Sequence, residues 1–257
     1  MSAMDYRERF LEFKSSVEGK TSLSDWILEF TFESLRDESL MGNLDETRHW
    51  YRQCVLENKL SFERIPLSDC RMWKTHDQSG SLVHESGGFF RVEGIRVKNS
   101  PTREVVSGWD QPIIAEVGYD GGILGLLRKR FQGVPHYLVE AKAEPGNFRI
   151  VQITTTIQAT FSNLMRLHEG NATYYSAYFT NPQDYGAAVL FSNWLSEDGG
   201  RLLNKRNRAM LVEVPENHEV ELASPSFRWV SLYQIKRLLL LDEAVVTPHL
   251  RGVISIV

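Results

Sequence analysis

The sequence of 257 residues predicts an α+β fold, in which helices precede a mixed sheet and another helix follows it. Apolar residues in roughly the first sixty positions recur with the period of an amphipathic helix. From Leu82 onward the period shortens, and short apolar runs are bounded by Gly and Pro, as in strands. A capped apolar segment near the end predicts the last helix.

The N-terminal part of the chain has a helical rhythm that is broken once. Its apolar positions are Tyr6, Phe10, Phe13, Val17, Leu44, Tyr51, Val55 and Phe62. Gly19 and Gly42 interrupt the pattern. We therefore predict a helical N-terminal extension over residues 1–62, packed on a main domain over residues 63–257.

The middle of the chain predicts the strands of the sheet. The strand-like runs are residues 89–97, 112–117, 122–127, 136–142, 186–191 and 208–214. Gly94 interrupts the first run, as at a bulge. Ser231, with Gln234 three residues later, forms a capping-box pattern before an apolar helical segment. Helices are therefore expected to flank a mixed, curved sheet.

Composition limits the classes of function. The formal net charge is −4, so no global positive field attracts nucleic acid, and an anionic ligand needs locally placed Arg and Lys. Cys54 and Cys70 are too few for a secreted disulfide framework and lack metal-ligand spacing. No run approaches the ~20 apolar residues that span a bilayer, and the N-terminus lacks a signal-peptide core. We expect a soluble, cytoplasmic protein.

A series of motifs links this chain to a known family. Residues 138–147 read LVEAKAEPGN, residues 151–160 read VQITTTIQAT, and residues 168–170 read HEG. Further blocks are residues 81–90, 105–113, 196–201 and 227–232, followed by Arg251. Over the region from about Phe62 to the C-terminus, this order of blocks resembles the NDP-hexose 2,3-dehydratases. Thr155-Thr156 and Glu169-Gly170 depart from the Pro-Thr and Gly-Gly that the family often has.

The resemblance implies a fold, a reaction and partners. It implies a Nudix-like α/β sandwich over residues 63–257, and removal of water across C2 and C3 of a thymidine-diphosphate 4-keto-6-deoxyhexose. The reaction needs no redox cofactor, and the sequence lacks the Nudix box that would hold Mg²⁺, so we expect no cofactor and no metal. Family members usually carry two such modules, which implies a homodimer here. A 3-ketoreductase would consume the product.

Lys142 and Glu144 are the first candidates for the chemistry. They alternate along a predicted strand, so both side chains emerge on one face, and Pro145-Gly146 ends the strand. A desolvated lysine can donate to an enolate or move a proton, while a carboxylate can act as base or hold the ammonium. The alternative is a half-exposed ion pair of little energetic value.

Other polar residues of the matched motifs are candidates for catalysis and sugar binding. His168 has a pKa range useful for acid–base catalysis, although it can also cap a turn. Gln158 and Thr156 lie two residues apart on an apparent strand, a spacing that forms one polar face able to read sugar hydroxyls or simply to face solvent. Asn163 belongs to the same motif and is expected to bind substrate.

A basic cluster predicts a diphosphate clamp. Arg201, Arg206 and Arg208 follow a Gly-Gly turn, and bidentate guanidinium contacts suit phosphate oxygens. The alternative is a solvated hairpin in which Arg208 pairs with Glu213.

Two aromatic residues are candidates to contact the substrate. Trp109 and Tyr174 are candidates to stack on the base or shape the sugar pocket, although most aromatics form core.

The main expectation is a dehydratase. A non-catalytic nucleotide-sugar-binding module, and an isomerase or epimerase acting through the same enolate, are the alternatives.

Overall fold

The structure is a computed structural model that describes residues 5–117, 121–160, 164, 172–241 and 244–255. The helices are α1 (Tyr6–Val17), α2 (Asp25–Glu33), α3 (Leu44–Glu57), α5 (Ser176–Thr180), α6 (Leu232–Leu239) and α7 (Pro248–Ile254), with 3-10 turns η1 (Leu67–Asp69) and η2 (Pro182–Tyr185). The strands are β1 (Trp73–Thr75), β2 (Leu82–His84), β3 (Phe90–Val97), β4 (Trp109–Glu116), β5 (Gly122–Phe131), β6 (Val134–Ala143), β7 (Val151–Thr154), β8 (Ile157–Ala159), β9 (Ala188–Ser196), β10 (Leu202–Leu203), β11 (Arg206–Val214) and β12 (Phe227–Val230).

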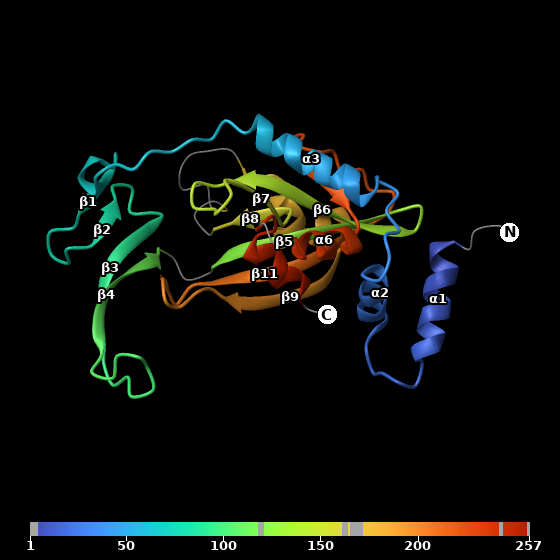
Figure 1. Ribbon diagram of the computed structural model, residues 1–257, viewed down its shortest axis with the longest axis horizontal. Helices are drawn as coiled ribbons and strands as arrows, with labels where there is room; N and C mark the ends of the chain where they lie inside the picture. The colour runs from blue at the N-terminus through green and yellow to red at the C-terminus, as the bar shows by residue number, and fades with distance from the viewer. Residues whose placement is uncertain (1–4, 118–120, 161–163, 165–171, 242–243, 256–257) are drawn as a thin grey trace.

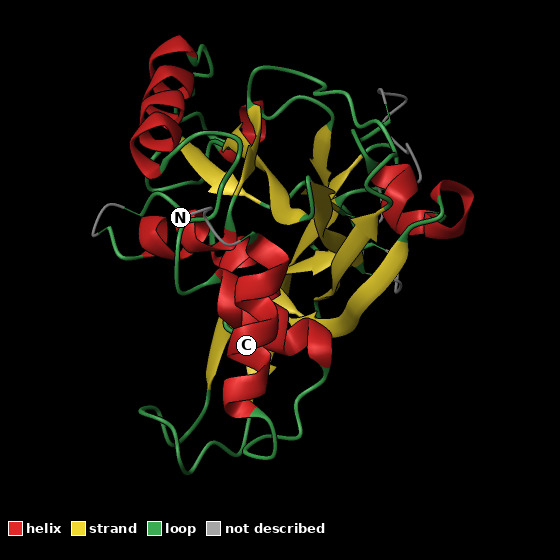
Figure 2. Cartoon of the chain, turned by 90° about the vertical axis from the view of Figure 1, so that its right-hand side faces the viewer, coloured by secondary structure: helices red, strands yellow, loops and turns green. Residues whose placement is uncertain are grey.

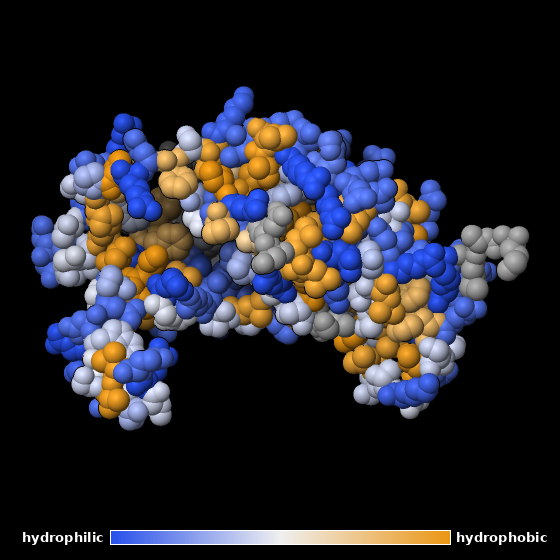
Figure 3. Space-filling view, in the orientation of Figure 1, coloured by the Kyte–Doolittle hydropathy of each residue, from blue (hydrophilic) through white to orange (hydrophobic). Residues whose placement is uncertain are grey.

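The strands form two sheets. The larger sheet has the order β12-β6-β5-β11-β9, with β7 paired to β6 and β8 paired to β5. Within it β11 runs parallel to β5, and the other pairs are antiparallel. The smaller sheet has the order β1-β2-β3-β4-β10 and stands to one side of the main body in Figure 1. Figure 3 shows a hollow between these two parts.

Helices cover both faces of the larger sheet, which therefore forms the centre of a sandwich. One face carries α2, α3, α6 and α7, whose Phe30, Tyr51, Ile235 and Leu250 pack in one core cluster. The opposite face carries α5, and there Phe179 packs with Leu138 and Met210. Figure 2 shows the main group of helices lying over one side of the strands. Among the described residues, no helix is long and apolar enough to cross a membrane.

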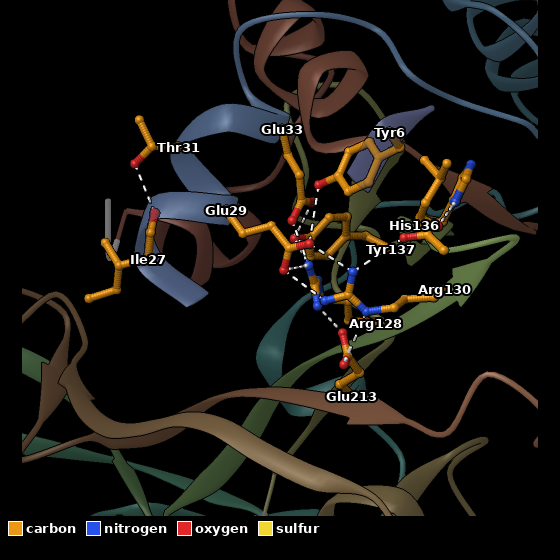
Figure 4. Close-up of polar contacts among 12 residues, drawn as sticks. Tyr6, Ile27, Glu29, Thr31, Glu33, Arg128, Arg130, His136, Tyr137 and Glu213 are labelled. Atoms are coloured by element: carbon orange, nitrogen blue, oxygen red, sulfur yellow. Dashed lines mark hydrogen bonds and ion pairs between the residues drawn. The ribbon is translucent and has the colours of Figure 1, made fainter. Parts of the chain in front are cut away.

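A buried ion network attaches α1 and α2 to the larger sheet (Figure 4). Arg128 of β5 is 3% exposed and donates to Glu33 at 2.6 Å and to Glu29 at 2.9 Å, both from α2, and it also contacts Glu213 of β11. Tyr137 of β6 donates to Glu33 at 2.7 Å. A buried guanidinium needs such partners because desolvation of an unpaired charge is costly.

The two central strands of the larger sheet pair over only part of their length. β5 and β6 are paired from Leu127 opposite Leu138 to the turn at Phe131. Beyond that point β6 pairs with β7 and β5 with β8, so the β7–β8 connection fills the fork between them. Thr156 lies in this fork, where its hydroxyl accepts the N–H of Leu127 at 2.8 Å and donates to the carbonyl of Leu138. One side chain thus satisfies both strands where they separate.

The structure confirms the α+β prediction and most predicted elements. Three helices occupy the N-terminal part, although Asp25–Glu33 was not among the apolar positions that predicted them. The strand predicted over residues 186–191 lies at Ala188–Ser196, and Trp73–Thr75 and Phe227–Val230 add strands that the sequence pattern missed. The last helix begins after Ser231, whose side chain accepts the Gln234 N–H at 3.1 Å. The Gln234 amide itself donates to Asp37 and to the carbonyl of Gly42.

We predict that Arg128→Met lowers the free energy of unfolding by about 3–5 kcal/mol, because it leaves the buried Glu33 carboxylate of α2 without its cationic partner. Denaturant unfolding of purified protein measures the change. Arg96→Met is the matched control, because Arg96 is 71% exposed and, among the described residues, forms its ion pair with the exposed Asp110. Its effect should stay within about 0.5 kcal/mol. Equal effects of both variants would contradict the structural role of Arg128.

We predict that Thr156→Val lowers the free energy of unfolding by about 1–3 kcal/mol. The change keeps the shape of the side chain but leaves one buried donor and one buried acceptor unsatisfied. Thr75→Val on the exposed strand β1 is the control, and we expect it to leave stability nearly unchanged. An unchanged denaturation midpoint for Thr156→Val would show that the hydroxyl does not support the fork.

Candidate functional site

A row of ionisable side chains runs along β6 beyond the fork. Glu140 and Lys142 alternate with the core residues Val139 and Ala141, so they point to the opposite face, which also carries Leu138. The Lys142 ammonium lies 3.0 Å from the Glu144 carboxylate just past the strand end. The structure therefore brings together Lys142 and Glu144, as alternation predicted, and adds Glu140 to the same row.

Gln158 of β8 closes this group from the other side of the fork. Lys142 donates to the Gln158 carbonyl at 3.4 Å, and the Gln158 amide lies 3.5 Å from the Glu144 carboxylate. The amide oxygen of Gln158 accepts the hydroxyl of Thr154 at 3.0 Å. Strands that are paired to different neighbours thus meet through polar side chains, and the resulting cluster contains an ammonium, two carboxylates, an amide and a hydroxyl.

Thr156 does not share the polar face predicted for it with Gln158. Its hydroxyl contacts two backbone groups in the fork, and the residue is only 1% exposed. The connection turns between β7 and β8, so strict alternation does not hold across Thr156. In the described structure this hydroxyl is engaged with backbone, and its predicted substrate contact stays a prediction.

Aromatic side chains stand next to the ionisable row. Phe227 of β12 pairs directly with Glu140, and its ring packs against Tyr175 at 5.0 Å and Tyr174 at 6.2 Å between centroids. Tyr174 is 60% exposed, while the Tyr175 hydroxyl donates to the Glu221 carbonyl at 2.9 Å. This places the candidate residue Tyr174 beside the row, with an exposed ring that a ligand can reach.

Two of the predicted clamp arginines stack on one tryptophan. The guanidinium of Arg206 lies 4.2 Å, and that of Arg208 4.3 Å, from the ring centroid of Trp194 in β9. Alternation puts both arginines on the same face as Met210, and Met210 shares its core cluster with Leu138. The arginine pair therefore lies on the same face of the sheet as the row on β6.

Hollows border the arginine pair on two sides. One of about 310 Å³ is lined by Arg91, Glu116 and Arg206, and one of about 430 Å³ by Phe179, Trp194 and Arg208. Gly121 lines both hollows, with φ +65° and no room for a Cβ, which would lie 2.4 Å from the Arg206 carbonyl. Backbone can approach a ligand closely at such a position.

The remaining predicted residues are placed elsewhere. Arg201 is exposed and pairs with Asp198 in the turn before β10. Trp109 opens β4 in the smaller sheet and donates to Gln111 at 2.6 Å. The structure does not bring either residue into the row on β6. Asn163 and His168 lie outside the described residues.

The alternative pairing of Arg208 with Glu213 is wrong. Glu213 contacts Arg128, and its other oxygen lies 3.6 Å from Arg130. Residues 208 and 213 are five positions apart on one strand, so their side chains point to opposite faces of the sheet.

Glu140 is the site residue that sequence reasoning missed. Burial raises the pKa of its carboxyl to about 7, the Lys142 ammonium opposes the rise, and the Glu144 carboxylate adds to it. A carboxyl with such a pKa is half ionised near neutral pH and suits proton transfer. The signal was present in the sequence, because Glu140, Lys142 and Glu144 follow one another at every second position.

The described residues include no group of three or more His, Cys, Asp or Glu side chains placed to hold a metal ion. The expected absence of a metal and of a cofactor stays a prediction. The arrangement places on one face a row of carboxylates that can exchange protons, a cationic hydrogen-bond donor and a separate pair of arginines, a residue type suited to anions.

Comparisons with known proteins match most of this chain. The sequence profile described as NDP-hexose 2,3-dehydratase matches residues 44–257, which include α3 and all the strands. A dTDP-4-dehydro-6-deoxy-alpha-D-glucopyranose 2,3-dehydratase from Streptomyces violaceoruber is 38% identical over 197 residues, covering 76% of this chain and 42% of that protein. Proteins of the same name from Amycolatopsis orientalis and Saccharopolyspora spinosa are 36% and 38% identical, covering 90% and 80% of this chain.

The matched region is only part of each relative's length. The chain covers 48% of the Amycolatopsis protein and 40% of the Saccharopolyspora protein, so it spans less than half the length of these relatives. Among solved structures, a Nudix hydrolase from M. smegmatis is 15% identical to this chain, with a TM-score of 0.34. The match covers 57% of this chain and 86% of the hydrolase chain. The profile match and the relatives show that this chain belongs to the NDP-hexose 2,3-dehydratase family.

Proposed function

We propose that this chain binds a thymidine-diphosphate 4-keto-6-deoxyhexose and removes water across C2 and C3 of its sugar. The observation that carries the proposal is the row on β6, in which Lys142 and Glu144 pair at 3.0 Å and face Gln158. This row lies inside the region that matches the family profile. The names of the relatives supply the substrate class, and the row supplies groups that such an elimination needs.

The 4-keto group sets the order of events. It acidifies the proton on C3, and removal of that proton moves an electron pair toward the C4 oxygen, which becomes an enolate. The carbonyl then re-forms as the C2–C3 double bond develops and the C2 hydroxyl leaves. The enol product exchanges its C3 hydroxyl proton for a proton on C2 and becomes a 2-deoxy-3,4-diketo sugar. The protein must therefore supply a base, a donor for the enolate and a proton for the leaving group.

Lys142 fits the role of the enolate donor. Its side chain is 29% exposed, so the ammonium is partly desolvated, and Glu144 holds it in place. A fixed cationic donor near a developing negative charge acts more strongly in a partly buried site than in water. Gln158 offers an amide that can read a sugar hydroxyl. The catalytic role predicted for His168 stays part of the proposal, as does the substrate contact of Asn163.

The arginine pair fits the diphosphate. Arg206 and Arg208 lie on the same face as the row and stack on Trp194. The edges of stacked guanidinium groups can make planar contacts with phosphate oxygens. Neighbouring strands lie ~4.8 Å apart, so β11 runs about 10 Å from β8, with β5 between them. Lys142 contacts β8, so the separation suits a ligand that carries its diphosphate next to the sugar.

The proposal extends to partners and location. A second copy of the chain would cover apolar side chains that are now exposed, among them Leu56 at 75%, Leu240 at 72% and Phe148 at 89%. Sedimentation at micromolar concentration distinguishes this dimer from a monomer.

The diketo product is unstable and calls for a 3-ketoreductase as the next enzyme. Both cysteines are free, which fits a reducing compartment such as the cytoplasm.

We predict that the purified chain, given thymidine-diphosphate 4-keto-6-deoxyglucose, 3-ketoreductase and NADPH in deuterated buffer, yields a sugar nucleotide that has lost one water and then gained one hydride from NADPH and one deuteron from solvent at the reduced ketone. Lys142→Met should lower kcat by about 10²–10³-fold, because it removes one enolate donor. Lys98→Met, an exposed lysine of the smaller-sheet region, is the control and should keep full activity. Mass spectrometry of the product measures both.

Other outcomes of that assay separate the alternatives. Deuterium uptake at C3 without water loss would favour an isomerase or epimerase that uses the same enolate. Tight binding of the sugar nucleotide without any change would favour a binding module. Full activity of Lys142→Met would remove Lys142 from the proposed mechanism.

We predict that replacing Arg206 and Arg208 together by Gln raises KM by at least tenfold and changes kcat by less than about threefold. A contact with the non-reacting diphosphate stabilises ground state and transition state alike, so its loss appears in KM. Steady-state kinetics measure both constants. Arg96→Gln, an exposed arginine of β3, is the matched control for loss of charge. An unchanged KM in the double variant would place the diphosphate elsewhere.

A further inference from the structure

Glu140 is a charged residue at an unusual place in the sheet. It lies on β6 between Thr154 of β7 and Phe227 of β12, which are its direct strand partners. The Thr154 hydroxyl donates to Gln158 and accepts from Thr247, so it is engaged elsewhere. On its other side the Phe227 ring packs under Tyr175. The carboxyl of Glu140 is therefore held on a sheet face whose nearest strand neighbours do not neutralise it.

Within the described part of the chain, few charged or titratable groups face Glu140. Lys142 and Glu144 come from its own segment, and Tyr175 comes from the segment before α5. β7 and β12 contribute Thr154 and Phe227, neither of which titrates. Among the described residues no hydrogen bond or ion pair joins the Glu140 side chain to a partner. A carboxylate on a rigid strand, partly buried and without a partner, is available to accept a proton from a ligand.

Glu144 differs from Glu140 in the features that matter for a base. It is 35% exposed, lies past the end of β6, and pairs with the Lys142 ammonium at 3.0 Å. The Gln158 amide lies near the same oxygen, at 3.5 Å. A carboxylate engaged in this way holds the lysine in position, and its oxygen is already occupied by an ammonium and an amide. The two glutamates of the row thus have different environments and suit different tasks.

We infer that Glu140 is the general base of this site and that Glu144 is a positioning residue for Lys142. The inference rests on the proposed dehydration. The Glu140 carboxylate takes the proton from C3, the C3–H electron pair forms the C3–C4 double bond, and the C4 oxygen becomes an enolate to which Lys142 donates. As C4=O re-forms, the C2–C3 double bond develops and the C2–O bond breaks. The departing hydroxide takes the proton back from Glu140 and leaves as water, which restores the carboxylate.

A general base at Glu140 must be ionised, so activity should depend on pH. Burial raises the pKa of Glu140 to about 7, and the base must be ionised to accept a proton. Above that pH Glu140 is a carboxylate, so its ionisation no longer changes kcat/KM. Below it, the ionised fraction falls tenfold for each pH unit, so kcat/KM should fall with a slope of one.

The test is the pH profile of kcat/KM for the whole chain and four variants. Glu140→Gln should lower kcat/KM by about 10²–10⁴-fold and abolish the acidic limb near pH 7. Glu140→Asp keeps a carboxylate, so it should retain an acidic limb at reduced rate, and it serves if the glutamine variant folds poorly. Glu144→Gln should lower the rate yet keep the limb. Glu12→Gln, an exposed residue of α1, should match the unchanged chain.

Three results would overturn the inference in different ways. An active chain whose Glu140→Gln variant keeps its rate and its acidic limb would assign the base elsewhere and leave the proposed dehydration intact. A chain that neither loses water from the substrate nor exchanges the C3 proton with deuterated solvent would overturn both the inference and the proposed function. Loss of the acidic limb in Glu144→Gln, with retention in Glu140→Gln, would reverse the two roles.

Discussion

The structure depends on the point at which β5 and β6 separate. Two strands that part in the middle of a sheet leave backbone donors and acceptors unpaired, and burial makes each unpaired group costly. Thr156 supplies the missing partners for Leu127 and Leu138, and β7 and β8 continue the pairing on either side. Because the strands diverge, the polar side chains of β6 face those of β8 across the fork. The candidate site lies where the sheet is split.

Further along the same two strands, buried charged residues attach the N-terminal helices to the sheet. Arg128 and Tyr137 use the face opposite to the row, and their carboxylate partners on α2 fix the N-terminal helices to the sheet. Both regions contain buried or half-buried charges, but their balance differs. Arg128 has several carboxylates within contact, whereas Glu140 has no such partner among the described residues. A saturated network stabilises the fold, and an unsaturated carboxyl remains available for chemistry.

The sequence predicted the α+β class and most of the longer elements because their apolar periods are strong. Alternation also predicted that Lys142 and Glu144 would meet, as they do at 3.0 Å. It failed at Thr156, because the chain turns between two strands that pair with different neighbours, a long-range feature that local pattern does not contain. Glu140 shared the alternation but was not singled out, because local sequence does not show that it is buried and lies beside Phe227 and Tyr175, which are far along the chain. Arg208 and Glu213 were separated by strand geometry that a linear reading of charge ignores.

The central claim is that the reacting sugar lies on the row of β6 at the fork. A crystal structure of the chain with a bound thymidine-diphosphate sugar tests this most directly, because it locates the hexose ring without relying on activity. The account predicts that C3 of the sugar lies within contact of the Glu140 carboxylate, that the C4 oxygen lies within hydrogen-bonding distance of Lys142, and that the diphosphate meets Arg206 and Arg208. A hexose bound away from β6, with Glu140 and Lys142 facing solvent, would contradict it.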